Sequence, residues 1–210
     1  LHYSLCQSNR PVCFPVIADD GPRHRKVTDL YDVGLALTVD HPVGNDLNVD
    51  GILLFIITGA NQGGKSTFLR AIGQSQLMLQ AGLFVGARTC SCHLVGRIYT
   101  HFTREEDDKM KRGKLDEELH RMAAIVNTIK RGDLLLLNES FASTNEQEGA
   151  AIGSDICDAL IESGIEIFFV THLYTFAERY LHNAAPWGQT CFLKAQRQTD
   201  GSRNYKVAPG

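Results

Sequence analysis

A glycine-rich loop that directly follows an apolar run constrains the fold of this chain more than any other feature. Residues 59–67 read Gly-Ala-Asn-Gln-Gly-Gly-Lys-Ser-Thr and match the pattern G-x-x-x-x-G-K-[ST] at every fixed position. The apolar run 52–57 predicts a buried strand, and helical spacing after the loop continues to Gly82. A strand, such a loop and a helix in this order indicate an α/β fold with a phosphate-binding site.

The residue types of the loop suit the binding of a nucleotide. Glycines lack a Cβ that would crowd the anion, so successive backbone N–H groups can converge on phosphate oxygens. Lys65 supplies positive charge for the β- and γ-phosphates, and the Ser66 hydroxyl can hold Mg²⁺. The N-terminus of the following helix adds partial positive charge. We therefore predict an ATP-binding loop made of Gly59, Ala60, Asn61, Gln62, Gly63, Gly64, Lys65, Ser66 and Thr67.

Polar residues follow two further predicted strands. The leucine run 134–137 leads into Asn138 and Glu139, and the apolar run 165–170 leads to His172. Short all-apolar runs are typical of parallel sheets covered on both faces, and ligands of such sheets bind at the carboxyl ends of the strands. We therefore expect a doubly wound, mostly parallel sheet, with the loop and these polar residues at one edge.

The roles of these residues follow from the needs of γ-phosphate hydrolysis, which are charge neutralisation and an oriented water. Lys65 provides charge, and Glu139 is placed to align the water or accept its proton. His172 could contact the γ-phosphate. The alternatives are a capping carboxylate for Glu139 and a structural histidine for His172.

Other patterns predict the surrounding elements. Residues 1–50 suggest a small β-rich lead-in lobe, with a turn at 19–22 and a strand at 33–39, before an ATPase domain over 51–210. The highly charged run 104–113 indicates a solvated loop. The sequence further predicts a core-packing helix that is closed by 130–132 and carries the apolar stripe Leu115, Leu119, Met122, Val126 and Ile129. A second helix is predicted to begin at the capping pair Asn145 and Glu148, to run through Ser163 and to end at Gly164.

Composition limits the partners. The net charge of −3 provides no overall basic field for nucleic acid, and no apolar run approaches the roughly 20 residues that span a bilayer. The chain carries neither an initiator Met nor a signal peptide, so we expect a fragment of a longer cytoplasmic protein. Among six cysteines, Cys90-Ser91-Cys92-His93 lacks a second ligand pair, and alternation along a strand would turn its side chains to opposite faces. Ordinary reduced cysteines are expected.

From about Asn45 to Tyr180 the chain resembles the C-terminal ATPase domain of the MutS family of DNA mismatch-repair proteins. The loop within 58–67 is similar to the family's nucleotide loop, and Leu136-Leu137-Asn138-Glu139 to its Walker B strand. Further segments with a resemblance, in order along the chain, are 80–87, 97–100, Asp107-Asp108, Glu118, Ser143-Thr144-Asn145 and Thr171-His172.

This resemblance implies a P-loop ATPase with an ABC-ATPase-like fold, which uses ATP and Mg²⁺ and works as a homodimer. By the same resemblance Asn61 and the loop amides hold phosphates, Glu139 is the hydrolytic glutamate and His172 a switch residue. Segments 104–117 and 140–148 would face the partner subunit. DNA would be bound by domains outside this chain.

Two departures indicate a divergent member. Asn138 stands where the family usually has an Asp that helps to hold the Mg²⁺ water shell, which predicts weaker metal binding and slower turnover. Residues 114–117 replace a family serine segment that reaches the other subunit's γ-phosphate. Two alternatives stay open: an ABC-type ATPase, although no L-S-G-G-Q-like run precedes Leu134, and a nucleotide-binding switch with little hydrolysis.

Overall fold

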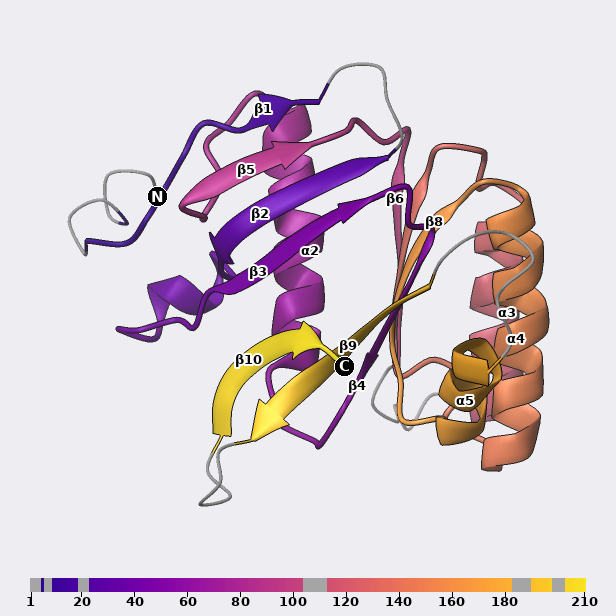
Figure 1. The fold of residues 1–210 in the computed structure, drawn as a ribbon. Coiled ribbons are helices and arrows are strands. Elements are labelled where there is room, and N and C mark those ends of the chain that lie inside the picture. The colour runs from indigo at the N-terminus through magenta and orange to yellow at the C-terminus, as the bar shows by residue number, and fades with distance from the viewer. Residues whose placement is uncertain (1–4, 6–8, 19–22, 104–112, 183–189, 198–202) are drawn as a thin grey trace. The chain divides into compact units, whose positions relative to one another are not determined.

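The computed structural model describes residues 5, 9–18, 23–103, 113–182, 190–197 and 203–210, which form two compact units. The first unit comprises Leu1–Gly51, Thr58–Leu94 and Phe192–Gly210, and the second comprises Ile52–Ile57 and Val95–Cys191. Both units combine strands with helices, so the predicted α/β class is confirmed (Figure 1). The predicted boundary between a lobe over 1–50 and a domain over 51–210 stays a prediction.

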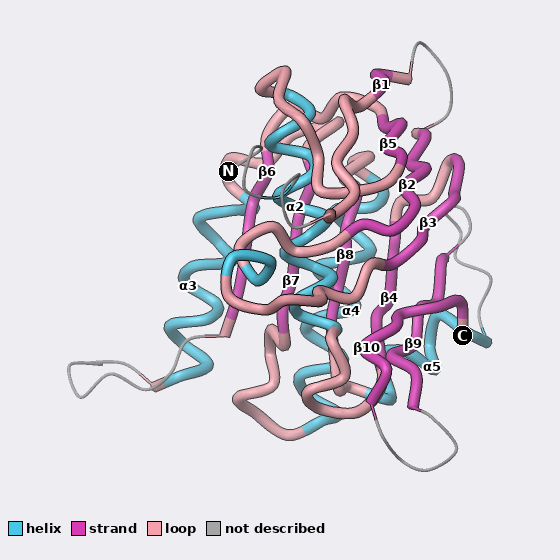
Figure 2. The backbone as a smooth tube through the Cα atoms, turned by 90° about the vertical axis from the view of Figure 1, so that its left-hand side faces the viewer, coloured by secondary structure: helices cyan, strands magenta, loops and turns pink. Residues whose placement is uncertain are grey.

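The second unit is built on four parallel strands in the order β4-β8-β7-β6. Figure 2 shows these strands side by side, and Figure 1 shows helices α3, α4 and α5 together on one side of them. The bounds are β4 Leu54–Thr58, β6 Ile98–Phe102, α3 Lys114–Val126, β7 Leu134–Asn138, α4 Glu146–Glu162, β8 Glu166–Val170 and α5 Tyr174–His182.

The three apolar runs that predicted strands become β4, β7 and β8. All five residues of β8 are buried, as are the first four residues of β4 and of β7. The rings of Phe55 and Phe168 stack with centroids 3.9 Å apart, which fixes the register of β4 against β8. Asn138 pairs in register with Val170, so the polar residues after β7 and β8 lie at the same edge of this sheet.

The first unit contains a four-stranded sheet in the order β1-β5-β2-β3, helix α2 and a C-terminal hairpin. Helix α2 lies against one face of this sheet, where the buried Arg25 of β2 donates a hydrogen bond to Gln76 (Figure 1). The bounds are β1 Val16–Ile17, β2 His24–Leu30, η1 Leu35–Leu37, β3 Asn45–Asp50, α2 Lys65–Gln80, β5 Thr89–Cys92, β9 Thr190–Arg197 and β10 Arg203–Pro209.

Two helices have the ends that the sequence predicts. Helix α2 is followed by Gly82 at φ 68°, a left-handed conformation that favours glycine. Helix α4 begins after Asn145, whose side chain accepts a hydrogen bond from the backbone N–H of Glu148, and Gly164 follows its C-cap Ser163 at φ 79°.

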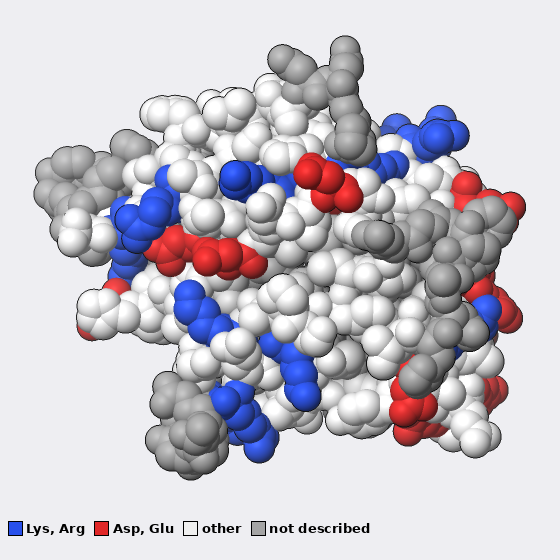
Figure 3. Space-filling model, viewed as in Figure 1, with Lys and Arg blue, Asp and Glu red and all other residues white. Residues whose placement is uncertain are grey.

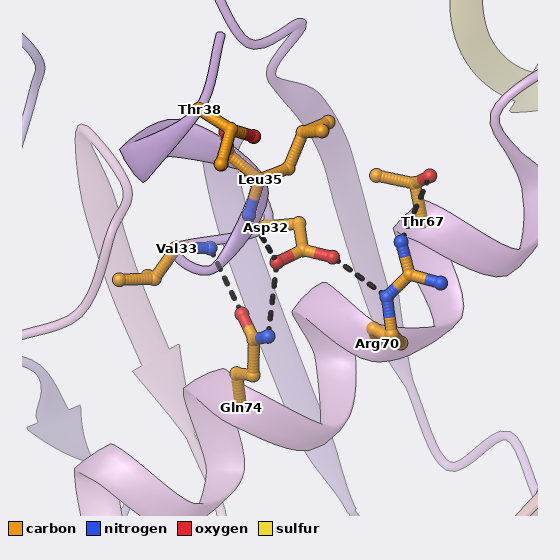
Figure 4. A network of polar contacts seen from close by, with 7 residues as sticks. All are labelled: Asp32, Val33, Leu35, Thr38, Thr67, Arg70 and Gln74. Carbon is orange, nitrogen blue, oxygen red and sulfur yellow. Dashed lines mark hydrogen bonds and ion pairs between the residues drawn. The ribbon is translucent and has the colours of Figure 1, made fainter.

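The predicted strand over 33–39 is wrong, because this segment contains the short 3-10 helix η1. Asp32 stabilises η1, because its carboxylate accepts a hydrogen bond from the backbone N–H of Leu35 at 3.0 Å. The same carboxylate accepts from Gln74 at 2.9 Å and from Arg70 at 2.8 Å, both in α2 (Figure 4). A local turn that caps its own N–H group competes with an extended strand.

The helix predicted over 115–129 ends earlier, at Val126, which is 44% exposed. The Thr128 hydroxyl donates to the backbone carbonyls of Ala124 and Ile125 and closes the turn there. The buried residues of α3 are Met122, as expected, and Glu118, which the apolar stripe did not include.

The predicted orientation of Cys90 and Cys92 on opposite faces of a strand is also wrong, because residues two apart in a strand share a face. Their Sγ atoms lie 3.9 Å apart and both side chains are buried. The hydrogen bond with Cys90 and the nearby Arg25 guanidinium hold the pKa of Cys92 below its usual value. Within the described residues the cysteines are free, and no cluster of metal-binding side chains occurs there.

Charge on the face drawn in Figure 3 is mixed. Basic and acidic side chains occur there in small, interspersed groups rather than in one field. None of the helices within the described part of the chain combines the length and apolar composition needed to cross a bilayer. The predicted turn at 19–22 and nearly all of the charged run, residues 104–112, lie outside the described residues.

Candidate functional site

The predicted phosphate-binding loop joins β4 to the first turn of α2. Gly59 has φ 117°, Gly64 has φ 90° and Gln62 has φ 59°, so the loop turns through the left-handed region three times. Gly64 is the N-cap of α2 and offers no side chain to its first N–H groups. These amides therefore remain suited to an anion.

Lys65 lies over its own loop. Its Nζ donates hydrogen bonds to the carbonyl oxygens of Gly59 at 2.8 Å and Ala60 at 3.0 Å, and the residue is only 4% exposed. The positive charge is thus held at the loop, while its predicted contact with phosphate stays a prediction. Ser66 and Thr67 follow in the first turn of α2, and Asn61 stands at the exposed tip of the loop.

The hairpin β9–β10 packs against this loop, within the same unit. A Cβ at Gly63 would lie 2.9 Å from Cβ of Ala195, and one at Gly64 would lie 3.0 Å from the carbonyl oxygen of Tyr205. Arg203 of β10 donates a hydrogen bond to the side chain of Gln62. Backbone packing therefore requires glycine at positions 63 and 64, in addition to the phosphate contact predicted for them. The sequence did not reveal this packing requirement.

The lead-in at 41–46 is also tied to the hairpin. The Asn45 side chain accepts a hydrogen bond from the backbone N–H of Val207 at 2.7 Å, and Lys206 donates to the carbonyl oxygen of Gly44. Gly44 and Asn45 are thus joined to β10 within the first unit.

Glu139 and His172 come together in the second unit. Nε2 of His172 lies 3.4 Å from Oε1 of Glu139, and both side chains are partly exposed, at 31% and 39%. Glu139 stands in the left-handed region at φ 55°. Its N–H donates to the Val170 carbonyl at 2.8 Å, and its carbonyl accepts from the Thr103 hydroxyl at 2.8 Å. The backbone that carries this carboxylate is therefore fixed on two sides.

Asn138 offers an oxygen that suits the water shell of a magnesium ion. Its Oδ1 is buried and has no hydrogen-bond partner among the described residues. A buried acceptor without a donor is costly, and a metal-bound water would satisfy it. The Asn138 amide oxygen and the neighbouring Glu139 carboxylate are oxygen ligands of the kind that Mg²⁺ prefers. The predicted metal site, which also includes Ser66 of the first unit, stays a prediction.

The predicted site residues therefore fall in two groups. Residues 59–67 belong to the first unit, and Asn138, Glu139 and His172 belong to the second. The structure brings together the members of each group, whereas the predicted meeting of the two groups at one edge stays a prediction.

The segments expected to face a partner subunit are described in part. Lys114–Glu117 form the first turn of α3. Within 140–148, Ser140 and Phe141 are buried, while Ser143 donates a hydrogen bond to the carboxylate of Glu118 at 2.9 Å. This buried network around Glu118 was not found from the sequence, although a Glu on the apolar side of a helix is a signal that could have shown it.

An α/β protein with a phosphate-binding loop sequence, and with an acidic and an imidazole side chain at neighbouring strand ends, is the class that the fold and site define. Within it, this chain belongs to the MutS family, because MutS domain V matches residues 55–209, from β4 to β10.

Curated relatives agree with this assignment. The chain is 33% identical over 155 residues to DNA mismatch repair protein MutS of Thermotoga petrophila, covering 73% of this chain and 20% of that protein. It is 27% identical over 182 residues to MutS protein homolog 4 of Homo sapiens, covering 83% and 19%. A third relative, MutS of Chloroflexus aurantiacus, is 31% identical over 186 residues, covering 81% and 19%. The chain thus spans about a fifth of the length of these relatives.

Proposed function

We propose that this chain is the ATP-binding and ATP-hydrolysing domain of a MutS-like DNA repair protein, with a P-loop NTPase fold. Its nucleotide state and homodimerisation would be coupled to DNA binding by domains outside this chain. The observation that carries the proposal is the complete loop 59–67 at the start of α2, in a chain of the MutS family. Two of the three relatives described above are named DNA mismatch repair protein MutS, which supports the link to repair.

In this proposal the two groups of residues have separate tasks. Lys65 and the loop amides neutralise the charge of the phosphates. Glu139 aligns the attacking water and accepts its proton, and the fixed backbone on either side of it favours one orientation of the carboxylate. His172, whose Nε2 lies 3.4 Å from Oε1 of Glu139, would contact the γ-phosphate and report its loss.

Magnesium would be held by the Ser66 hydroxyl and by waters bound to Asn138 and Glu139. When bound, it supplies positive charge that offsets the charge of the transferring phosphoryl group. Asn138 accepts a hydrogen bond from such a water without adding charge, so the protein's own contribution to metal affinity is weaker than with a carboxylate.

The test is ATP hydrolysis and self-association of the purified protein and of Glu139→Ala. We expect the substitution to lower phosphate release by at least about 100-fold, because it removes the group that aligns water. ATP-bound dimers should accumulate in light scattering at the same time. Glu162→Ala is a matched control, since it removes an exposed carboxylate from the last turn of α4, outside the segments expected to face the partner subunit.

The same measurement decides between catalysis and a binding switch, which the neutral Asn138 favours as a second candidate. A wild-type protein that binds ATP but releases phosphate no faster than Glu139→Ala is a switch. A wild-type protein that binds no ATP at any Mg²⁺ concentration contradicts both functions.

A further inference from the structure

The backbone directly after β7 has an uncommon conformation. Glu139 has φ 55° and Phe141 has φ 64°, so two residues other than glycine occupy the left-handed region within three positions. A bulky residue such as Phe adopts this conformation only where its surroundings hold it there. The question is therefore which contacts hold this turn.

His101 of β6 makes the most extensive of these contacts. It is fully buried, and its Nδ1 lies 2.7 Å from the hydroxyl oxygen of Ser140. Its ring lies 5.9 Å from the ring of Phe141, with the two planes 21° apart. On its other side, Nε2 lies 3.1 Å from the backbone carbonyl oxygen of Glu118 in α3. His101 thus spans the distance from α3 to the residue that follows Glu139.

The two ring nitrogens of His101 have different partners and different tasks. A carbonyl oxygen only accepts, so Nε2 carries the hydrogen that it donates to Glu118. Nδ1 is hydrogen-bonded to the Ser140 hydroxyl, whose single hydrogen has two acceptors within reach, this nitrogen and the carbonyl oxygen of His101. The hydroxyl oxygen of Ser140 also lies 3.0 Å from the carbonyl oxygen of His101.

A second contact joins the same two segments. The Ser143 hydroxyl donates to Oε2 of Glu118 at 2.9 Å, and Glu118 is 1% exposed. Glu118 therefore accepts a hydrogen bond from His101 at its backbone carbonyl oxygen and one from Ser143 at its carboxylate. The turn after Glu139 is thus joined to α3 at two points, one buried through His101 and one partly buried at Ser143.

We propose that His101 is a positioning residue, which holds the Glu139 carboxylate in place for hydrolysis through the Ser140 hydroxyl and the left-handed turn. This inference rests on the proposed function. His101 acts only through Ser140 and Phe141 and has no contact with substrate. Because its two nitrogens have separate partners, the contact that serves Glu139 can be separated experimentally from the contact that serves only the packing of α3.

Two substitutions make this separation. His101→Asn places its side-chain amide near the position of Nδ1, where it can form a hydrogen bond with Ser140 as acceptor or as donor, and loses the contact to Glu118. His101→Gln places an amide N–H near the position of Nε2, where it can donate to Glu118, and loses the contact to Ser140. Each variant removes one buried hydrogen bond, so we expect the Tm of the two variants to fall below the wild-type value by similar amounts.

The readouts are kcat and KM for ATP, with Tm from thermal unfolding, on the purified protein. We expect His101→Gln to lower kcat on the order of tenfold to 100-fold with an unchanged KM, because small displacements of a catalytic group have effects of this size. His101→Asn should keep a kcat close to the wild-type value. A purely structural role would lower kcat equally in both variants.

Ser140→Ala removes the same hydrogen bond from its other end. Its kcat should match that of His101→Gln, and the double variant should be no slower than either single variant. Ser75→Ala is the matched control, because Ser75 is also a buried hydroxyl, which donates to the Ile72 carbonyl in α2.

The outcomes are distinct. A wild-type protein without ATP hydrolysis contradicts the proposed function and this inference together. An active wild-type protein with equal kcat in His101→Asn and His101→Gln overturns the inference alone, as does an additive loss in the double variant.

Discussion

At the scale of single residues, Asp32 shows how one buried carboxylate can decide local structure. It is 3% exposed and accepts hydrogen bonds from a backbone N–H, an amide and a guanidinium. Burial by itself would raise the pKa of Asp32, but these hydrogen bonds and the charge of Arg70 outweigh it and lower the pKa. The carboxylate therefore stabilises the folded protein in its ionised form.

We predict that Asp32→Asn lowers the free energy of unfolding at pH 7 by about 1.5–3 kcal/mol, the range for hydrogen bonds to charged groups. Since the folded-state pKa lies below the unfolded value of about 3.9, this contribution is present above that value and is lost as the pH falls through the folded pKa. Denaturant unfolding of both proteins from pH 7 to pH 2 measures the difference.

Asp29→Asn is the control for this prediction. Asp29 pairs with Arg88 at 3.0 Å, but both side chains are partly exposed, at 33% and 68%. Surface pairs of this kind contribute about 0–1 kcal/mol. Equal losses for the two variants, or a difference that persists at pH 2, would contradict the role given to the ionised Asp32.

At the scale of elements, the sequence predicts what depends on local pattern. The strands β4, β7 and β8 and the capped helices α2 and α4 follow from apolar runs and cap residues. The strand predicted over 33–39 was wrong because the conformation of this segment depends on Arg70 and Gln74, which lie in a helix distant in sequence. No periodicity in the segment itself contains that information.

The candidate site divides in the same way. The loop and Glu139 could be predicted, because each follows an apolar run and carries its chemistry in its own sequence. The contact of Ala195 and Tyr205 with the loop glycines could not, since β9 and β10 have no motif that points to the loop. His101 was missed for a similar reason: its partners Ser140 and Glu118 are separated from it by 39 and 17 positions.

The packing of β9 on the loop gives a prediction at this scale. Gly63→Ala should lower the free energy of unfolding by about 1–3 kcal/mol, because its Cβ would lie 2.9 Å from both the Ala195 Cβ and the Ala60 carbonyl oxygen. Ala195→Gly in the same chain should restore part of the loss by removing the first clash. Urea unfolding of the single and double variants measures both effects.

Gly113→Ala is the control, since among the described residues other than its chain neighbours no heavy atom lies within 4 Å of the position of its Cβ. If Ala195→Gly restores nothing, the hairpin does not limit the space at the loop. A Gly63→Ala protein as stable as the wild type would show that the loop and β9 separate freely.

At the scale of the whole molecule, ATP binding should raise the free energy of unfolding. A ligand present at 100 times its Kd adds about 2.7 kcal/mol to the folded state. For a chain of this length, that corresponds to a rise in Tm of about 5–10 °C. We expect this rise with ATP and Mg²⁺ in a thermal scan of the wild type, and no rise with Lys65→Ala.

The comparison with adenosine serves as the control for this measurement, because it lacks the phosphates that the loop would bind. An equal rise with adenosine and with ATP would place the recognition elsewhere than at Lys65. An unchanged rise in the Lys65→Ala protein would do the same.

The packing of the hairpin on the loop also bears on the order in which the protein is made. Gln62 and Arg203 are 141 residues apart, and Asn45 and Val207 are 162 apart. As the ribosome synthesises the chain from its N-terminus, the loop emerges long before the strands that cover it. Contacts so distant in sequence form slowly, because a long segment must first be brought back. The loop would therefore complete its surroundings only after all of unit 2 has left the ribosome, and ATP could not assist the earlier stages of folding.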